Sequence, residues 1–232
     1  MPSEILTIVT ARNEGERLGA TLAALAIAFP GSPVWVADDA STDATPEIAA
    51  AAGARVVRSG RPLGKGGAAT AAARDALSHA RATPAGRDGS SIFVFCDGDL
   101  GASARSLDRL AAAIGNGEAD MAVAVFARRV GGGIGLVVCL ARRAIRRRCG
   151  LNMRAPISGQ RALSQAAVAD VLPFAAGFGM EIGMTIDAVR AGRRVTEVEL
   201  DLSHRATGRT LSGFAHRARQ LLDIMRAQAA RV

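Results

Sequence analysis

Short apolar runs alternate with helix-like segments through the first half of the 232-residue chain. The runs contain many Val and Ile residues and are apolar at most positions, which is typical of strands buried on both faces. Strands that alternate with helices form a parallel sheet with helices on both sides. We therefore predict an α/β fold with a mostly parallel central sheet flanked by helices. The predicted strands cover residues 5–10, 34–37, 54–57, 91–96 and 120–126.

The second half of the chain is less regular. Residues 194–203 alternate like a half-exposed strand, and a loop leads into the segment SGQRALS at residues 158–164. There is no internal repeat and no long linker, so we expect a single domain over residues 1–232. The predicted helices cover residues 14–29, a segment capped by Thr42 or Asp43, a segment after Gly67, and residues 103–114, 134–149, 181–191 and 211–229.

The net charge is distributed unevenly along the chain. Residues 1–116 carry 11 basic and 12 acidic side chains, a net charge of −1, whereas residues 117–232 carry 18 basic and 9 acidic side chains, a net charge of +9. We therefore expect the second half to meet phosphates, lipid headgroups or nucleic acid. Aromatic residues make up only 3% of the chain, which argues against single-stranded nucleic acid as the partner.

The cysteines and the apolar runs indicate a cytoplasmic protein. Cys96, Cys139 and Cys149 are odd in number and far apart, which suits a reducing compartment and argues against a zinc site. The chain opens without a signal peptide, and its longest apolar run, residues 131–141, is too short to cross a bilayer. Whether the protein also binds peripherally to the inner face of the membrane is a question that these features leave open.

Polar clusters follow four of the predicted strands. In open parallel sheets, ligands bind outside the carboxyl ends of the strands, so we expect the four clusters to line one binding site. The clusters are TARNE at residues 10–14, DDASTD at 38–43, LGKGGA at 63–68 and DGDLG at 97–101.

Asp38 and Lys65 are candidates for contacts with a nucleotide. We expect Asp39 or Ser41 to cap the next helix, which leaves Asp38 free to accept a hydrogen bond from a base or ribose. Lys65 is the only lysine in the chain, and the glycines on both sides allow close approach to a phosphate. The segment does not have the spacing of a P-loop.

Asp97 and Asp99 end a buried strand with one glycine between them, and neither has a basic neighbour in the sequence. Two carboxylates this close repel each other unless a positive charge lies between them. A hard divalent cation, Mg²⁺ or Mn²⁺, that also binds a diphosphate would supply this charge. The alternative is a pair of loop acids that cap the helix beginning near Ser103.

The segments LTIVTARNE, VADDASTDAT, PLGKGGA and FVFCDGDL, in this order, resemble the family 2 glycosyltransferases of the GT-A fold. The polyprenyl-phosphate sugar transferase branch is the most similar. ISGQRALS resembles its SGFRAL segment, and residues 177–209 resemble its helix, strand and basic loop. The resemblance covers nearly the whole chain. It implies a GT-A domain in which residues 1–116 bind the nucleotide sugar and residues 117–232 form the basic acceptor side.

The resemblance implies a metal-dependent, inverting hexosyltransferase. It would move a sugar from a nucleotide sugar, usually a UDP-sugar, to a polyprenyl phosphate or another phosphorylated acceptor. Asp97 and Asp99 match the DxD motif, with Asp99 the more direct metal ligand. Ala11 and Glu14 would hold the nucleoside and Asp38 the base. The full set of implied site residues is Ala11, Glu14, Asp38, Lys65, Asp97 and Arg128 for the donor, Asp97, Asp99 and His204 for the metal, and Asp99, Glu181 and Arg205 for catalysis.

Some of these assignments keep alternatives. Arg128 and Arg205 fall where lipid-phosphate transferases bind the diphosphate and the acceptor phosphate, whereas His204 is equally compatible with a surface loop. Gly101 lies where a glutamine often follows the DxD motif, and we expect none of the C-terminal membrane helices that many relatives carry. Both departures leave the acceptor open.

Two features bear on the acceptor. An alcohol acceptor needs a general base, for which Glu181 is the candidate; its alternative role is that of an acid favoured at a helix N-terminus. A phosphate acceptor needs only arginines.

On a helix over residues 134–149, four arginines would form a basic stripe that suits an anionic membrane, a soluble phosphorylated acceptor or plain solvent. They are Arg142, Arg143, Arg146 and Arg147, and the opposite side has Leu140, Ala141, Ala144 and Ile145.

Two other functions compete with this hypothesis. A sugar-1-phosphate nucleotidyltransferase needs a Gly- and Arg-rich loop after the first strand, which TARNEGER at residues 10–17 does not provide. A non-catalytic binder of anionic polymers or nucleic acid would show strongly salt-dependent duplex binding and would not need the four strand-end clusters. We expect no nucleic-acid partner. The sugar and the oligomeric state stay open.

Overall fold

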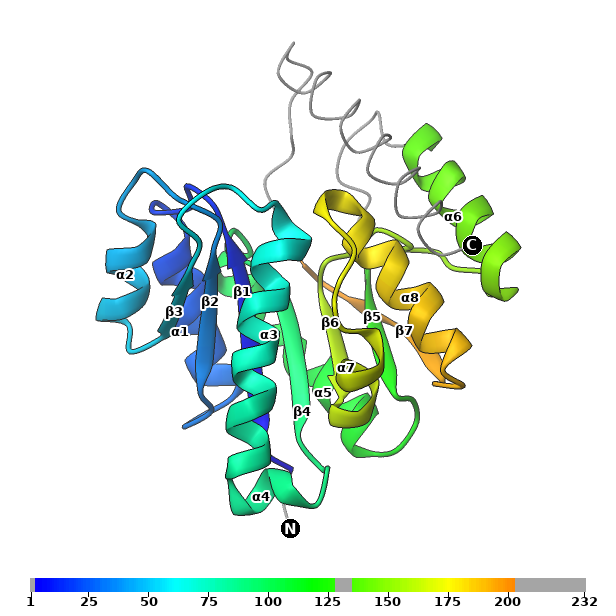
Figure 1. The fold of residues 1–232 in the computed structure, drawn as a ribbon, viewed down its shortest axis with the longest axis horizontal. Coiled ribbons are helices and arrows are strands. Elements are labelled where there is room, and N and C mark those ends of the chain that lie inside the picture. The colour runs from blue at the N-terminus through cyan, green and yellow to red at the C-terminus, as the bar shows by residue number, and fades with distance from the viewer. Residues whose placement is uncertain (1–2, 128–134, 203–232) are drawn as a thin grey trace.

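The computed structural model describes residues 3–127 and 135–202. These residues build one seven-stranded sheet in the order β3-β2-β1-β4-β6-β5-β7, with helices on both faces (Figure 1). The predicted α/β fold with a mostly parallel sheet is confirmed. The strands are β1 Ile5–Ala11, β2 Val34–Asp38, β3 Arg55–Arg58, β4 Ile92–Asp97, β5 Met121–Phe126, β6 Arg161–Ser164 and β7 Val195–Leu200.

The helices of the described residues largely follow the predicted order. The predicted helix at 103–114 divides into a 3₁₀ turn, Gly101–Leu107, and a shorter α-helix, because the chain turns tightly after β4. The predicted helix at 211–229 lies outside the described residues. The α-helices are α1 Leu18–Ala28, α2 Thr45–Ala51, α3 Lys65–Ala82, α4 Pro84–Arg87, α5 Asp108–Gly115, α6 Gly135–Cys149, α7 Gln165–Val171 and α8 Met180–Arg190. No helix among them is both long and apolar enough to span a membrane.

Strand β6 was not predicted as a strand. It runs antiparallel between β4 and β5, whereas the other neighbouring pairs of strands are parallel. The segment is only four residues long and begins with an arginine, so it shows no apolar run. Only its position in the middle of the sheet makes it a strand.

The two faces of the sheet carry separate apolar cores. Because side chains alternate along a strand, Phe93 and Phe95 of β4 enter one core, whereas Val94 and Cys96 enter the other. Helices α3, α6, α7 and α8 contribute to the first core, and α1 and α5 to the second. Figure 1 shows α3 and α8 in front of the sheet and α1 behind it. The strands are therefore held rigidly up to their carboxyl ends.

The beginning of α3 lies against the segment that leads into α8. The chain turns at Gly64, whose φ is +76°, and a Cβ on Gly66 would lie 1.8 Å from the carbonyl oxygen of Ala175. Nearby, the Thr70 hydroxyl accepts a hydrogen bond of 3.0 Å from the Phe174 amide. This backbone-to-backbone approach brings Lys65, the first residue of α3, towards the first turn of α8.

Gly66→Ala should destabilise the fold by about 1–3 kcal/mol, because the added methyl group overlaps backbone that cannot move aside. Gly19→Ala in α1 is the matched control, since its Cβ would meet only Ile48 Cγ2 at 3.7 Å. Alanine is also the better helix former there. Urea unfolding of both variants measures the difference. Equal stability of the two variants would contradict a tight α3 junction.

Candidate active site

The carboxyl ends of β1, β2 and β4 lie side by side. Thr10 pairs with Asp97, and Ala11 pairs with Asp38 in the sheet register. The predicted clusters at residues 10–14, 38–43 and 97–101 therefore meet at one edge of the sheet. The fourth cluster reaches the same edge through Lys65, whose Nζ lies 2.6 Å from Asp97 Oδ1.

Lys65 forms ion pairs with two carboxylates from distant parts of the chain. Its Nζ lies 2.6 Å from Asp97 Oδ1 and 2.8 Å from Glu181 Oε1, and Glu181 is buried at the beginning of α8. Burial alone would lower the pKa of Lys65, but the two carboxylates outweigh burial and raise the pKa above its ordinary value. The positive charge beside Asp97 is thus supplied, at least in part, by the protein itself. The sequence-based interpretation assigned that charge to a metal ion alone.

Asp97 is held by two further side chains, Thr10 of the predicted cluster at residues 10–14 and Gln160, to which the sequence analysis gave no role. Thr10 Oγ1 donates to Asp97 Oδ1 at 3.1 Å, and Gln160 Nε2 donates to Asp97 Oδ2 at 2.8 Å. Burial alone would raise the pKa of Asp97, but Lys65 and these two donors hold it below its usual value. Gln160 lies within the SGQRALS segment, so the resemblance of this segment was the only signal that pointed to it.

Asp99 is half-buried and makes no hydrogen bond or ion pair within residues 3–127 and 135–202. The 3₁₀ turn that follows β4 has Leu100 at its N-cap and no side-chain cap, so neither aspartate caps it. The capping alternative for the aspartate pair is therefore wrong. A carboxylate that is not engaged by protein donors, at a strand end, fits a hard divalent cation, which prefers oxygen ligands and keeps several waters.

The described residues contain no group of three His, Cys, Asp or Glu side chains that could hold a metal ion. Asp97 and Asp99 therefore have no third His, Cys, Asp or Glu ligand in that part of the chain. Three of the predicted site residues, Arg128, His204 and Arg205, lie outside the described residues. A metal at this site would depend on Asp99, water and the ligand's own oxygens.

Asp38 is fully buried at the end of β2. Its Oδ1 accepts a hydrogen bond of 3.2 Å from the Ser41 amide, and its Oδ2 has no hydrogen-bond partner among the described residues, although Arg58 Nε lies 3.2 Å away. A buried carboxylate oxygen without a donor is costly, so it favours a ligand N–H. Arg58 is a residue that the sequence analysis missed.

Neither Asp39 nor Ser41 caps the following helix, contrary to the prediction, since α2 has Ala44 at its N-cap. Asp39 contacts another segment. Its Oδ1 accepts hydrogen bonds from the amides of Leu63 at 2.6 Å and Gly64 at 3.1 Å. Asp39 thus holds the loop that precedes Lys65. Asp43, which was predicted as a cap, accepts from the Thr45 amide at the start of α2.

The loop that connects β1 to α1 is hydrogen-bonded to the segment that follows β2. The Glu14 amide donates to Thr45 Oγ1 at 2.9 Å, and the Asn13 amide donates to Ser41 Oγ at 3.0 Å. Ala11 is buried, and its carbonyl oxygen accepts from the Asp39 amide. Ala11 and Glu14 therefore lie on the same side of the sheet edge as Asp38.

Arg161 is a buried cation that organises the loop before β6. It donates to the carbonyl oxygens of Ser158 at 2.9 Å and Pro156 at 3.3 Å, and to Thr185 Oγ1 at 2.9 Å. Burial lowers the pKa of Arg161 to about 10, so the guanidinium stays charged at neutral pH. A Cβ on Gly159 would lie 2.5 Å from Lys65 Nζ. The loop is thus pinned to α8 and lies directly against the Lys65–Asp97 pair.

Helix α6 presents the predicted basic stripe. Ala141, Ala144 and Ile145 are buried, whereas the four arginines of the stripe are exposed. Leu140 was predicted on the apolar side, but it is 38% exposed because α6 buries only a narrow face. The arginine prediction is confirmed and the Leu140 prediction is wrong.

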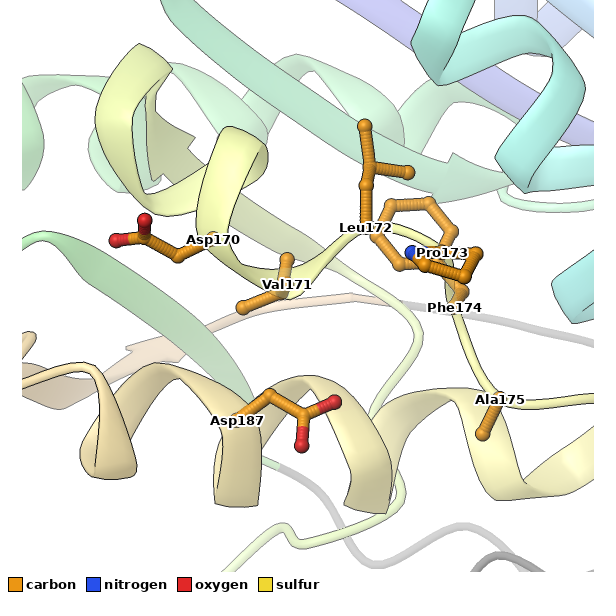
Figure 2. Close-up of a pocket in the computed structure, with 7 residues that line it drawn as sticks. All are labelled: Asp170, Val171, Leu172, Pro173, Phe174, Ala175 and Asp187. Carbon is orange, nitrogen blue, oxygen red and sulfur yellow. The ribbon is translucent and has the colours of Figure 1, made fainter. Parts of the chain in front are cut away.

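An open hollow lies between α7 and α8. Figure 2 shows the residues that line it. They are Asp170, Val171, Leu172, Pro173, Phe174, Ala175 and Asp187. No predicted site residue is among them, so the candidate active site is the strand-end cluster.

Comparison with known proteins gives a consistent result. The family described as glycosyl transferase family 2 matches residues 7–170. An undecaprenyl-phosphate mannosyltransferase of Micrococcus luteus is 31% identical over 221 residues, which cover 88% of this chain and 85% of that protein.

Solved structures agree with the sequence match. Glucosyl-3-phosphoglycerate synthase from Mycobacterium tuberculosis in complex with phosphoglyceric acid has a TM-score of 0.74, with 26% identity over 99% of this chain and 80% of that one. The same enzyme with Mn²⁺, UDP and glucosyl-3-phosphoglycerate has a TM-score of 0.73, with the same identity and coverage. The expected GT-A fold is confirmed. Because the matched segment contains the strand-end cluster and most of the sheet, the chain belongs to glycosyl transferase family 2.

Proposed function

We propose that this glycosyltransferase is metal-dependent and inverting, and that it moves a sugar from a UDP-sugar to a polyprenyl phosphate or another phosphorylated acceptor. The observation that carries the proposal is the unengaged carboxylate of Asp99 beside Asp97, at the strand edge where Asp38 also lies. Family membership favours a transferase over a nucleotidyltransferase or a non-catalytic anion binder. Residues 1–116 would hold the donor and residues 117–232 the acceptor.

On the donor side, each residue has a task that its geometry supports. Asp38 Oδ2, which is ion-paired with Arg58 but accepts no hydrogen bond among the described residues, would accept an N–H from the base, and Ala11 and Glu14 would border the nucleoside. Asp99, together with Asp97 and His204, would hold Mg²⁺ or Mn²⁺, which supplies positive charge to the departing diphosphate. Crystals of the glucosyl-3-phosphoglycerate synthase contain Mn²⁺ or Mg²⁺ with UDP, which supports these assignments.

On the acceptor side, Glu181 is the candidate base. Lys65 holds its Oε1, and Oε2 makes no hydrogen bond within the described part of the chain. Oε2 is therefore available to take a proton from an acceptor hydroxyl. Arg128 and Arg205 would bind the phosphates. A phosphorylated acceptor is supported by the name of the undecaprenyl-phosphate mannosyltransferase and by the crystals of the synthase with UDP-glucose and phosphoglyceric acid.

Asp99→Asn should lower Mn²⁺-dependent transfer from, or hydrolysis of, a UDP-sugar by roughly 100-fold or more, because the developing diphosphate charge loses its electrostatic support. Asp88→Asn, in the exposed turn after α4, is the matched control and should have full activity. Thermal-shift titrations with UDP, GDP and their sugars, with and without Mn²⁺, identify the nucleotide in parallel. Undiminished activity of the Asp99 variant would exclude the metal role.

Glu181→Gln should separate the two acceptor classes. A hydroxyl acceptor such as 3-phosphoglycerate needs a base, so its transfer rate should fall about 100-fold, whereas undecaprenyl phosphate is already an anion and should lose far less. Rates with each acceptor, at equal melting temperature of variant and wild type, make the comparison. An unchanged rate with a hydroxyl acceptor would remove Glu181 from the role of base.

The exposed arginines of α6 are proposed to hold the protein peripherally at an anionic membrane. Arg143, Arg146 and Arg147 are exposed on one side of the helix. Each basic side chain near an anionic surface contributes about 1 kcal/mol of binding. The net charge of +9 in residues 117–232 acts in the same direction.

Replacing Arg143, Arg146 and Arg147 together by Gln should weaken binding to phosphatidylglycerol vesicles, measured by co-sedimentation, by roughly 100-fold on that scale. Binding to neutral phosphatidylcholine vesicles should be weak for all forms. Arg74, Arg81 and Arg87 are exposed at the other end of the molecule, around α3 and α4, and their replacement by Gln gives a control with the same net charge. Equal losses in the two triple variants would refute a specific α6 surface.

A further inference from the structure

Both oxygens of Asp97 are already engaged by donors of the protein itself. Oδ1 lies 2.6 Å from Lys65 Nζ and accepts a hydrogen bond of 3.1 Å from Thr10 Oγ1. Oδ2 accepts a hydrogen bond of 2.8 Å from Gln160 Nε2. A carboxylate offers about four lone-pair sites, of which three are occupied here. A divalent cation that approaches Asp97 must therefore compete with an ammonium group.

The ammonium group of Lys65 is fixed from several sides. Glu181 Oε1 lies 2.8 Å away, and the Glu181 side chain is only 5% exposed. On another side, the space next to Lys65 Nζ is closed by the backbone at Gly159, where even a methyl group would lie 2.5 Å away. The Lys65 side chain is itself only 21% exposed. Lys65 is thus a built-in counter-ion for two carboxylates that would otherwise face each other uncompensated.

Asp99 stands in contrast to Asp97. It is half-buried and has no donor among the described residues, so its oxygens are open to a cation. A single open carboxylate is a poor site for Mg²⁺ or Mn²⁺, which in such sites depend on substrate phosphates for further ligands. The ammonium group of Lys65, which is paired with the neighbouring Asp97, repels a cation and so weakens the site further.

We propose that Lys65 makes cation binding conditional on the nucleoside diphosphate. In the ligand-free protein, Lys65 neutralises Asp97 and Glu181, and the cation is held weakly through Asp99. The oxygens of a bound diphosphate would supply the further ligands that the cation needs. They would also give the Lys65 ammonium group another anion to pair with, so cation and nucleotide bind cooperatively. This inference rests on the proposed function and adds to it a residue that couples two ligands.

The test is Mn²⁺ binding, followed by the loss of the free Mn²⁺ signal in electron paramagnetic resonance, without and with saturating UDP. We expect UDP to tighten Mn²⁺ binding to the wild-type protein at least about tenfold, and Mn²⁺ to tighten UDP binding by the same factor, since coupling is reciprocal. Equal Mn²⁺ affinity with and without UDP would overturn the proposal. This measurement needs no variant.

Lys65→Met should bind Mn²⁺ without UDP roughly tenfold more tightly than the wild type, because Asp97 and Glu181 lose their counter-ion, and UDP should add less. Arg12→Met is the matched control: it removes the same charge at the same sheet edge, but Arg12 pairs with Asp39 at 3.6 Å. Its Mn²⁺ affinity should stay within about twofold of the wild type. If Lys65→Met fails to fold, Lys65→Gln keeps a donor for Asp97 and removes only the charge.

The outcomes separate the two proposals. If Lys65 serves stability alone, its variant has a lower melting temperature with unchanged Mn²⁺ affinity, and the inference is wrong. An equal gain of affinity in the Arg12 variant would show a general charge effect and would also overturn it. If UDP does not bind at all, the proposed donor fails, whereas the comparison of Mn²⁺ alone still decides the role of Lys65.

Discussion

The ion pairs of Lys65 with Asp97 and Glu181 connect three parts of the molecule that are distant in the sequence. Asp97 ends β4, Lys65 begins α3 and Glu181 lies in the first turn of α8. Desolvating three charged groups is costly, and it is tolerated here because each is paired and because Gln160 and Thr10 satisfy the remaining oxygens of Asp97. The proposed donor side and the proposed acceptor side of the site are thus joined through one ammonium group.

The antiparallel strand β6 makes this arrangement possible. By entering the sheet between β4 and β5, it places the loop before Arg161 next to the carboxyl end of β4. That loop delivers Gln160 to Asp97 and presents a glycine where the ammonium of Lys65 needs room. The buried guanidinium of Arg161 then fastens the loop to α8. The antiparallel direction of β6 therefore determines which residues of this loop surround Asp97 and Lys65.

Much of the fold could be predicted because its signals are local. The parallel strands β1 to β5 were located to within a residue or two, since apolar runs and strand-end polar clusters need only their immediate sequence. The short β6 could not be predicted, because nothing in four residues that begin with a buried arginine marks a strand. Asp39 was misassigned as a cap for a related reason: its partners, the amides of Leu63 and Gly64, are far away in the sequence.

By itself, the sequence determined the order of the parallel strands β1 to β5, the positions of Asp38, Asp97 and Asp99 at strand ends, and the excess of basic residues in the second half. Only the tertiary structure decided that Lys65 neutralises Asp97, that Glu181 shares this ammonium, and that Asp99 is left without a donor in the described residues. The reason is physical. Periodicity and strand ends depend on neighbouring residues, whereas charge pairing depends on which segments the packed helices and the reversed strand bring within 3 Å of each other.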